Sequence, residues 1–305
     1  MSWIALSLLS AIFLGCYDIA KKSSVRDNSV PVVLLLNVLT AALFWSVPIS
    51  LAFVAQNEVT DSPSNAWLSN LVTIGAEQHA LLFGKSALVG VSWICAFFAL
   101  KHLPISIATP IRATSPLWTV TLAVTCMGER PTALQWLGIA IVLAAFLAFS
   151  RVGAREGIHF HRDRWVYLMA IATLLGAISA LYDKYLLQEL KLAPATVQAW
   201  FSVYLVPIML PLAVRWYQRD RISSPFQWRV TIPLIAVFLL IADYSYFCAI
   251  AQPDAMITVI SPIRRSAIVI PFLFGIVSLR EENWRLKAPC IAATLLGVFL
   301  LSQAS

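Results

Sequence analysis

Apolar residues occur along this chain in long runs of about twenty, and short polar connections separate most of these runs. A run of roughly 20 apolar residues can cross the hydrocarbon core of a bilayer as an α-helix. A helix is expected because lipid offers the backbone no hydrogen-bond partners, and the alternating ten-residue segments of a membrane barrel are missing from the sequence. The pattern predicts an all-α polytopic membrane protein with ten spans, over residues 3–22, 31–54, 80–100, 104–127, 131–150, 165–187, 195–215, 231–250, 256–279 and 287–303.

Composition supports this class and excludes others. The 305 residues are 60% hydrophobic and 12% charged, with a mean hydropathy of +0.80, whereas soluble domains carry about 25% charged residues. Five scattered cysteines without C-x-x-C spacing exclude a disulfide scaffold. The sequence holds no P-loop, no G-x-S-x-G and no H-E-x-x-H motif. We therefore expect no enzyme activity, no cofactor and no metal site, in a protein of the cell inner membrane.

Charges in the connections predict how the chain is oriented. The connections after the first, third, fifth, seventh and ninth spans hold fifteen Lys and Arg residues, Lys21 among them, whereas the other face has only Arg130, Lys184 and Lys191. Because cytoplasmic loops are rich in Lys and Arg, this count places both termini outside the cytoplasm. The net charge of +7 is then mainly a topology signal, and we assign no nucleic-acid partner to it.

The chain also repeats itself. At an offset of 152, Thr109-Pro110-Ile111-Arg112 matches Ser261-Pro262-Ile263-Arg264, and at an offset of 165, Tyr17-Asp18 matches Tyr182-Asp183. The matches predict two five-helix units, residues 1–152 and 163–305. Five is an odd number, so the second unit would enter the membrane from the opposite side. Inverted repeats of this kind are typical of secondary transporters, in which one half moves against the other around a site at the midplane.

A family resemblance follows from the end of the first unit. Pro116, then Gly128-Glu129-Arg130 and Gln135-Trp136-Leu137-Gly138, resemble the drug/metabolite transporter superfamily and its ten-helix EamA-like members. The resemblance covers essentially the whole chain and implies an exporter of metabolites, amino acids or drugs, or an exchanger. The second unit departs from the pattern, with Arg280-Glu281-Glu282 and Ile268 at the matching positions. Family members usually keep both termini in the cytoplasm, against the charge count, so the orientation stays open.

Charged residues inside the predicted spans are candidate functional groups. A charge at the bilayer centre costs about 2.5–3.5 kcal/mol on insertion scales, and Arg112 and Arg264 each lie eight residues into a span, roughly 12 Å deep. Five intramembrane cations, the fifth being Lys184, oppose three aspartates. The candidate substrate contacts are Lys85, Trp93, Arg112, Ser115, Thr119, Tyr244, Arg264 and Arg265. The candidate gating or coupling residues are Tyr17, Asp18, Tyr182, Asp183 and Asp243.

Two interpretations of these charges remain open. In the first, aspartates neutralise the arginines and only hold the helices together. In the second, the excess cations bind a carboxylate, phosphate or phosphonate, which the planar fork of Arg suits. We expect Asp18 to pair with Arg112 and Asp183 with Arg264, each pair closing one gate, and protonation of Asp18, Asp183 or Asp243 would couple transport to a proton gradient. Glu129 and Glu281 are expected to cap or pair at helix ends.

The sequence therefore predicts a secondary carrier that moves a small organic solute by alternating access, with a preference for anionic or zwitterionic solutes. Its partners would be that small-molecule solute and the membrane lipids, and it would act as a monomer or a homodimer. The alternatives are a lipid-head-group flippase, an integral-membrane transferase and a purely structural membrane subunit. A structural subunit would have all its buried charges paired and no cavity.

Overall fold

The computed structural model describes residues 1–55, 71–103, 111–112, 114–153, 163–270, 274 and 284–303. Within those residues the secondary structure is helical, with no strand. The first half contributes α1 (Trp3–Val25), α2 (Val30–Ala55), α4 (Ala76–His102), α6 (Ser115–Cys126) and α7 (Ala133–Gly153). The second half contributes α8 (Arg164–Lys184), α9 (Pro194–Arg215), α10 (Thr231–Ile250), α11 (Ile257–Arg265) and α13 (Trp284–Gln303).

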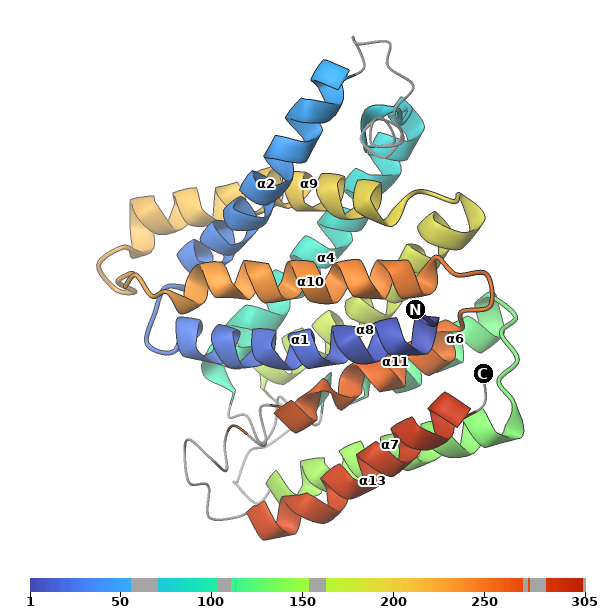
Figure 1. Ribbon diagram of the computed structural model, residues 1–305. Helices are drawn as coiled ribbons and strands as arrows, with labels where there is room; N and C mark the ends of the chain where they lie inside the picture. The colour runs from blue at the N-terminus through green and yellow to red at the C-terminus, as the bar shows by residue number, and fades with distance from the viewer. Residues whose placement is uncertain are drawn as a thin grey trace.

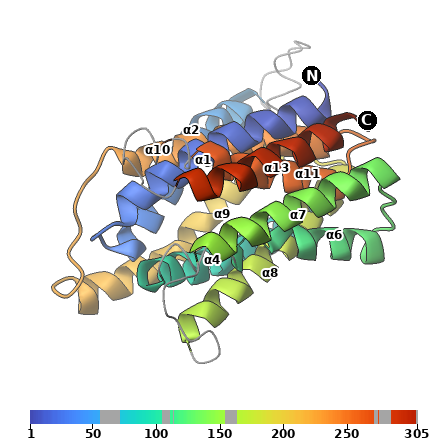
Figure 2. The same cartoon turned by 90° about the horizontal axis from the view of Figure 1, so that it is seen from below.

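Six of these helices are long and apolar enough to cross a membrane, and the described parts of α6, α7 and α13 are shorter apolar helices. The chain is thus a multi-pass membrane protein, as the apolar runs predicted. Large apolar side chains point outward, as expected of helices in contact with lipid. Leu43, Phe44, Leu295 and Phe299 are each more than half exposed. The start of α1 and the end of α13 lie at the same end of the helices in two perpendicular views (Figure 1, Figure 2). We call this the terminal end and the other the distal end.

Two of the predicted spans are wrong in form. In place of one helix over 104–127, α6 begins only at Ser115, after a turn at Thr114, and residues 104–110 and 113 lie outside the described residues. In place of one helix over 256–279, α11 ends at Arg265 and a 3-10 turn follows at Ser266–Ile268. Proline contributes to the first break, because Pro116 takes the second position of α6, where its missing N–H leaves no hydrogen bond unmade.

Helices of the first half of the chain pack against helices of the second half. Helix α1 packs on α10 and α8 packs on α4, while α2 packs on α9, α6 on α11 and α7 on α13. The α7–α13 pair approaches closely through glycines: a Cβ added at Gly297 would lie 2.9 Å from the carbonyl oxygen of Gly138. Small residues allow such close approach between membrane helices. This pair lies to one side of the remaining helices (Figure 1).

Candidate functional site

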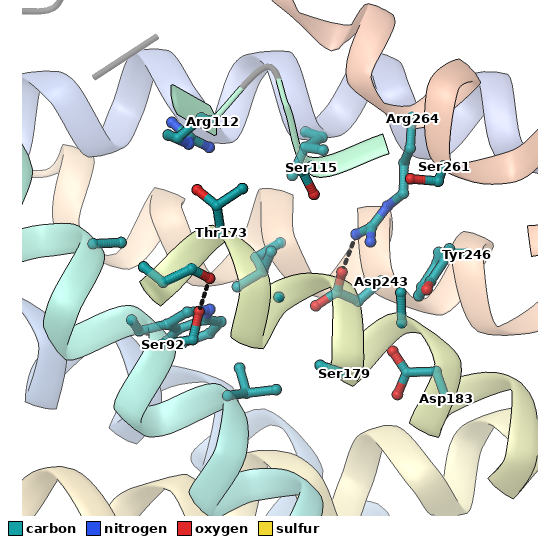
Figure 3. Close-up of a pocket in the computed structure, with 18 of the residues that line it drawn as sticks. Ser92, Arg112, Ser115, Thr173, Ser179, Asp183, Asp243, Tyr246, Ser261 and Arg264 are labelled. Atoms are coloured by element: carbon teal, nitrogen blue, oxygen red, sulfur yellow. Dashed lines mark hydrogen bonds and ion pairs between the residues drawn. The ribbon is translucent and has the colours of Figure 1, made fainter. Parts of the chain in front are cut away.

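A cavity of about 210 Å³ lies between the helices and is lined mainly by α1, α4, α8, α10 and α11 and by residues at the start of α6 (Figure 3). Its polar lining includes most of the residues singled out from the sequence. Those lining residues are Tyr17, Lys85, Trp93, Arg112, Ser115, Thr119, Asp183, Asp243, Arg264 and Arg265. Most residues that the repeat and the intramembrane charges indicate therefore line one cavity.

Arg264 connects three helices across this cavity. Its guanidinium forms an ion pair with Asp243 of α10 (Figure 3), and its Nε donates a hydrogen bond of 2.9 Å to Ser10 Oγ of α1. The guanidinium carbon also lies 3.9 Å from the ring centroid of Tyr246. Ser10 in turn donates to the carbonyl oxygen of Ala242. Arg264 therefore holds α11 against α1 and α10 through its charge, its donors and its ring contact.

Asp183 pairs with Lys85, and the predicted pairing of Asp183 with Arg264 is wrong. Lys85 Nζ lies 2.7 Å from Asp183 Oδ1, and the side chains are 2% and 6% exposed. The ammonium also lies 4.1 Å from the ring centroid of Phe201 and 4.9 Å from that of Phe247. Among the described residues, Asp183 Oδ1 nevertheless has no partner that meets hydrogen-bond geometry. The pairing follows the packing of α8 on α4, which the sequence repeat does not encode.

The predicted pair of Asp18 and Arg112 is confirmed, and it is loose. Arg112 Nη2 lies 3.6 Å from Asp18 Oδ1, and the two side chains are 31% and 24% exposed. Arg112 precedes the turn at Thr114 instead of lying inside a continuous helix. Such a partly hydrated pair contributes little to stability.

Two further cations line the cavity, and neither forms an ion pair with a carboxylate of the described residues. Arg265 Nη2 donates to Ser115 Oγ at 3.0 Å. Lys21 is 6% exposed, with its Nζ 4.2 Å from the ring centroid of Phe97 and 5.3 Å from that of Tyr17. The count of loop charges places Lys21 in a connection, but α1 continues to Val25. Its spacing of four residues from Tyr17 places both on one helix face, which was the available signal.

The remaining candidates divide between the cavity and its surroundings. Trp93 lies edge-on to Phe201, with ring centroids 6.2 Å apart, and Thr119 Oγ1 donates to the carbonyl oxygen of Ser115. Tyr244 is 39% exposed and does not line the cavity. Tyr182 also points elsewhere, since its hydroxyl donates to the carbonyl oxygen of Leu81 at 3.0 Å. Tyr246, on the same helix as Tyr244, lines the cavity in its place.

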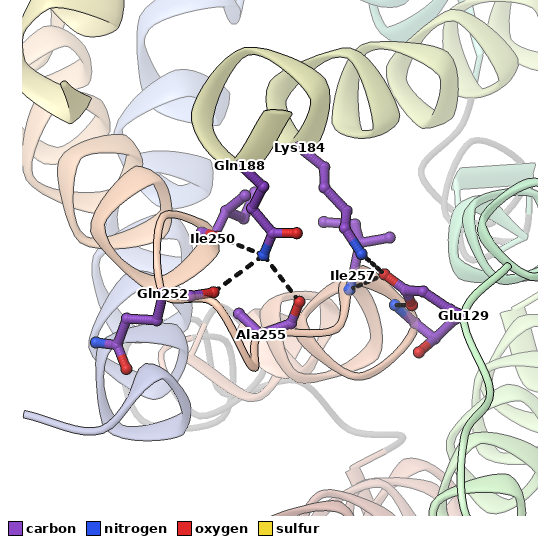
Figure 4. A network of polar contacts seen from close by, with 8 residues as sticks. Glu129, Lys184, Gln188, Ile250, Gln252, Ala255 and Ile257 are labelled. Atoms are coloured by element: carbon purple, nitrogen blue, oxygen red, sulfur yellow. Dashed lines mark hydrogen bonds and ion pairs between the residues drawn. The ribbon is translucent and has the colours of Figure 1, made fainter. Parts of the chain in front are cut away.

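Glu129 joins three segments at the terminal end (Figure 4). Its carboxylate pairs with Lys184 Nζ at 2.5 Å and accepts hydrogen bonds from the backbone N–H groups of Ile257 and Thr258, at 2.8 and 2.9 Å. A carboxylate at the first turn of α11 accepts hydrogen bonds from free backbone N–H groups, and its charge interacts favourably with the helix dipole. Glu129 thus caps and pairs as expected, whereas Glu281 lies outside the described residues. We call Glu129, Lys184 and the first turn of α11 the Glu129 latch.

Gln188 forms hydrogen bonds with the neighbouring connection between α10 and α11. Its side-chain Nε2 donates to the carbonyl oxygens of Ile250, Gln252 and Ala255, at 2.8, 3.0 and 3.1 Å (Figure 4). These contacts fasten the connection between α10 and α11 to the π-turn at Tyr185–Glu189. Glu129 and Gln188 therefore each make polar contacts that link neighbouring segments at the terminal end.

Six described helices are long and apolar enough to cross a membrane, and the described helices enclose a charged cavity, as a membrane transporter requires. Residues 1–151 match the EamA-like transporter family. The chain belongs to this family and so to the drug/metabolite transporter superfamily, as Gly128-Glu129-Arg130 and its surroundings predicted.

Two curated relatives are both pseudopaline exporters CntI, from the UCBPP-PA14 and PAO1 strains of Pseudomonas aeruginosa. Each is 21% identical over 170 residues, which cover 55% of this chain and 57% of the relative. The chain thus spans 57% of the length of the curated relatives it matches. A solved crystal structure is similar over 99% of this chain and 96% of its own, with a TM-score of 0.68 and 17% identity, and it shows the same fold.

Proposed function

We propose that this chain is a secondary-active exporter of small organic solutes that bear an anionic group, either anions or zwitterions. The observation that carries the proposal is the charge around the cavity. Among the described residues, five cations, Lys21, Lys85, Arg112, Arg264 and Arg265, face three aspartates, Asp18, Asp183 and Asp243. Excess positive charge in a low-dielectric cavity favours an anionic or zwitterionic solute. Family membership and the exporter relatives support export as the direction.

The proposed mechanism is alternating access between two inverted five-helix repeats. Helix packing supports this: the contact of α1 with α10 has its counterpart in that of α8 with α4, as a two-fold relation between halves requires. The Glu129 latch would hold the terminal end shut while the cavity extends toward the distal end, where Lys21 and Arg112 lie. Opening the terminal end would require Lys184 and the first turn of α11 to leave Glu129.

Proton coupling is the second part of the mechanism we propose. Asp183 is almost fully buried between Lys85 and the cavity, and Asp243 is held by Arg264. Protonation of either aspartate would release its cation to the cavity and so change the affinity for an anion. The proposal places the protein in the inner membrane, as a monomer or homodimer, with the solute and lipids as its partners.

Transport by purified protein in liposomes tests the proposal. Counterflow of radiolabelled amino acids, organic acids and phosphorylated sugars would be compared for wild type, Arg264→Gln and the control Arg219→Gln, which changes an exposed Arg. We expect uptake of an anionic or zwitterionic solute, lost in Arg264→Gln and kept in Arg219→Gln. Uptake restricted to cationic solutes, or no uptake of any solute in the panel, would overturn the proposal.

A further inference from the structure

Two cations at the distal end of the cavity carry charge that no described carboxylate neutralises. Lys21 comes from the last turns of α1, and Arg265 is the last residue of α11. Both line the same cavity. We propose that they form the binding site for a doubly negative group, so that the transported solute is a dianion or carries a dianionic end. This inference rests on the proposed function and adds the charge and the place of binding.

Lys21 is held in place without being neutralised. Its side chain is 6% exposed and its ammonium lies over the rings of Phe97 and Tyr17. Aromatic faces attract a cation but accept no conventional hydrogen bond, so the three ammonium N–H donors still need acceptors. No hydrogen bond from Nζ to a described residue is present, and the side chain reaches the cavity. Since no described residue supplies those acceptors, they are open to water or a solute anion.

Arg265 has a similar deficit. One Nη2 hydrogen bond to Ser115 Oγ accounts for one of the five N–H donors of a guanidinium. Ser115 is itself 2% exposed, so this bond fixes the position of the guanidinium without supplying charge. Arg264, the preceding residue, differs in that it is paired with Asp243. Among the described residues, adjacent arginines thus have distinct environments, one neutralised and one not.

Asp18 is the one described carboxylate near these cations, and it already forms an ion pair with Arg112. Lys21, Arg112 and Arg265 all interact electrostatically with Asp18 and with one another. Three cations against one carboxylate leave two positive charges. Like charges at short range repel, and burying them costs free energy unless an anion arrives. Two negative charges on the solute would balance the group, whereas one would leave half of the excess.

The neighbouring pairs explain why the excess lies here. Lys85 is neutralised by Asp183, and Arg264 by Asp243, so the part of the cavity near the terminal end is balanced. A dianion would therefore orient with its charged end toward Lys21 and Arg265. Planar forked donors such as Arg bind carboxylate and phosphate oxygens, and a Lys ammonium adds a point charge.

Binding by the full-length protein in detergent tests this site. We would titrate wild type with succinate, inorganic phosphate and the monoanion butyrate at constant ionic strength, following intrinsic tryptophan fluorescence and the melting temperature. Succinate carries its two negative charges on separate carboxylates, whereas dianionic phosphate carries both on one group. Comparing their affinities shows which arrangement of charge the site prefers. The variants are Lys21→Gln and Arg265→Gln, with Lys22→Gln as the matched control, since Lys22 is the exposed neighbour of Lys21.

We expect at least one dianion to bind ten-fold or more tightly than butyrate, and each of Lys21→Gln and Arg265→Gln to remove that preference. Lys22→Gln should bind like wild type. Each of the two glutamine variants tests the site by itself. If Lys21→Gln does not fold, Lys21→Arg, which keeps the charge, should still bind the dianion. Equal affinity for dianions and butyrate, or an unchanged preference in both glutamine variants, would overturn the site.

Failure of the site and failure of the proposed function give different results. If wild type transports panel solutes in liposomes but shows no dianion preference, the dianion site is wrong and the exporter proposal stands. If dianions bind through Lys21 and Arg265 but no solute is transported, the site stands and the exporter proposal fails.

Discussion

Glu129 and Lys184 join the loop after α6 to the end of α8, with 2.5 Å between carboxylate and ammonium. The same carboxylate caps α11, the helix that carries Arg264 and Arg265 to the cavity. One buried side chain thus connects a structural feature at the terminal end to the position of the candidate solute contacts. Changes at Glu129 should therefore affect both stability and transport.

Glu129→Gln is expected to destabilise the protein and loosen the terminal end. Glutamine keeps one carbonyl acceptor but loses the charge, so Lys184 loses its ion pair and at least one N–H of α11 loses its acceptor. The loss should amount to about 1–3 kcal/mol, seen as a lower melting temperature, and a cysteine placed at the start of α11 should react faster with a membrane-impermeant maleimide. Glu189→Gln, at an exposed position, is the control. Equal melting temperatures for the two variants would contradict the latch.

The pair of Asp243 and Arg264 is expected to act as a unit in transport. Asp243→Asn leaves an unneutralised Arg264 in the cavity, and Arg264→Gln leaves an unneutralised aspartate. Each single variant should lower the counterflow rate ten-fold or more. Because the two residues contact each other, the double variant should lose less than the product of the single effects. Strictly multiplicative losses would mean that the residues act separately.

Lys85 and Asp183 allow a test of stability. Replacing one partner of a buried ion pair leaves an isolated charge, at a cost of about 3–5 kcal/mol. Lys85→Met alone and Asp183→Leu alone should therefore both lower the melting temperature, and the combined variant should recover part of that loss. Measurement of melting in the same detergent checks this. A double variant less stable than either single one would show that the pair is not the main interaction of these side chains.

The sequence predicted the helical membrane class and which charges gather in one cavity, because both depend on local hydropathy and on the internal repeat. It did not predict the partner of Asp183, since that depends on which helix α8 packs against. Lys21 was missed because a Lys near a helix end usually reaches the interface, whereas here α1 extends further and Phe97 covers the side chain.

Glu129 illustrates the same limit. Its capping role was predictable from its place after a helix, but the capped helix begins 128 residues later at Ile257. Prolines marked the irregular segments around Arg112 and Arg264. They did not fix the turns at Thr114 and Ser266, because proline restricts several neighbouring positions and tertiary packing selects among them.

The α7–α13 contact gives a prediction about the relation between the two halves. A Cβ at Gly297 would lie 2.9 Å from the carbonyl oxygen of Gly138, and a Cβ at Gly138 would lie 3.0 Å from that of Gly297. Backbone atoms cannot move aside without separating the helices, so Gly138→Ala and Gly297→Ala should each lower stability, by about 1–3 kcal/mol. Two-fold related halves require similar losses from the two substitutions.

Gly84→Ala is the matched control for this pair. Its added Cβ would meet only the Tyr182 hydroxyl at 3.8 Å, an ordinary contact, so the gain in helix propensity should leave stability equal or higher. No described residue of α7 or α13 lines the cavity, and the fraction of Gly297→Ala that folds should therefore keep wild-type counterflow. A large loss from one glycine only would argue against a two-fold contact, and lost transport in well-folded protein would show that this pair moves with the carrier.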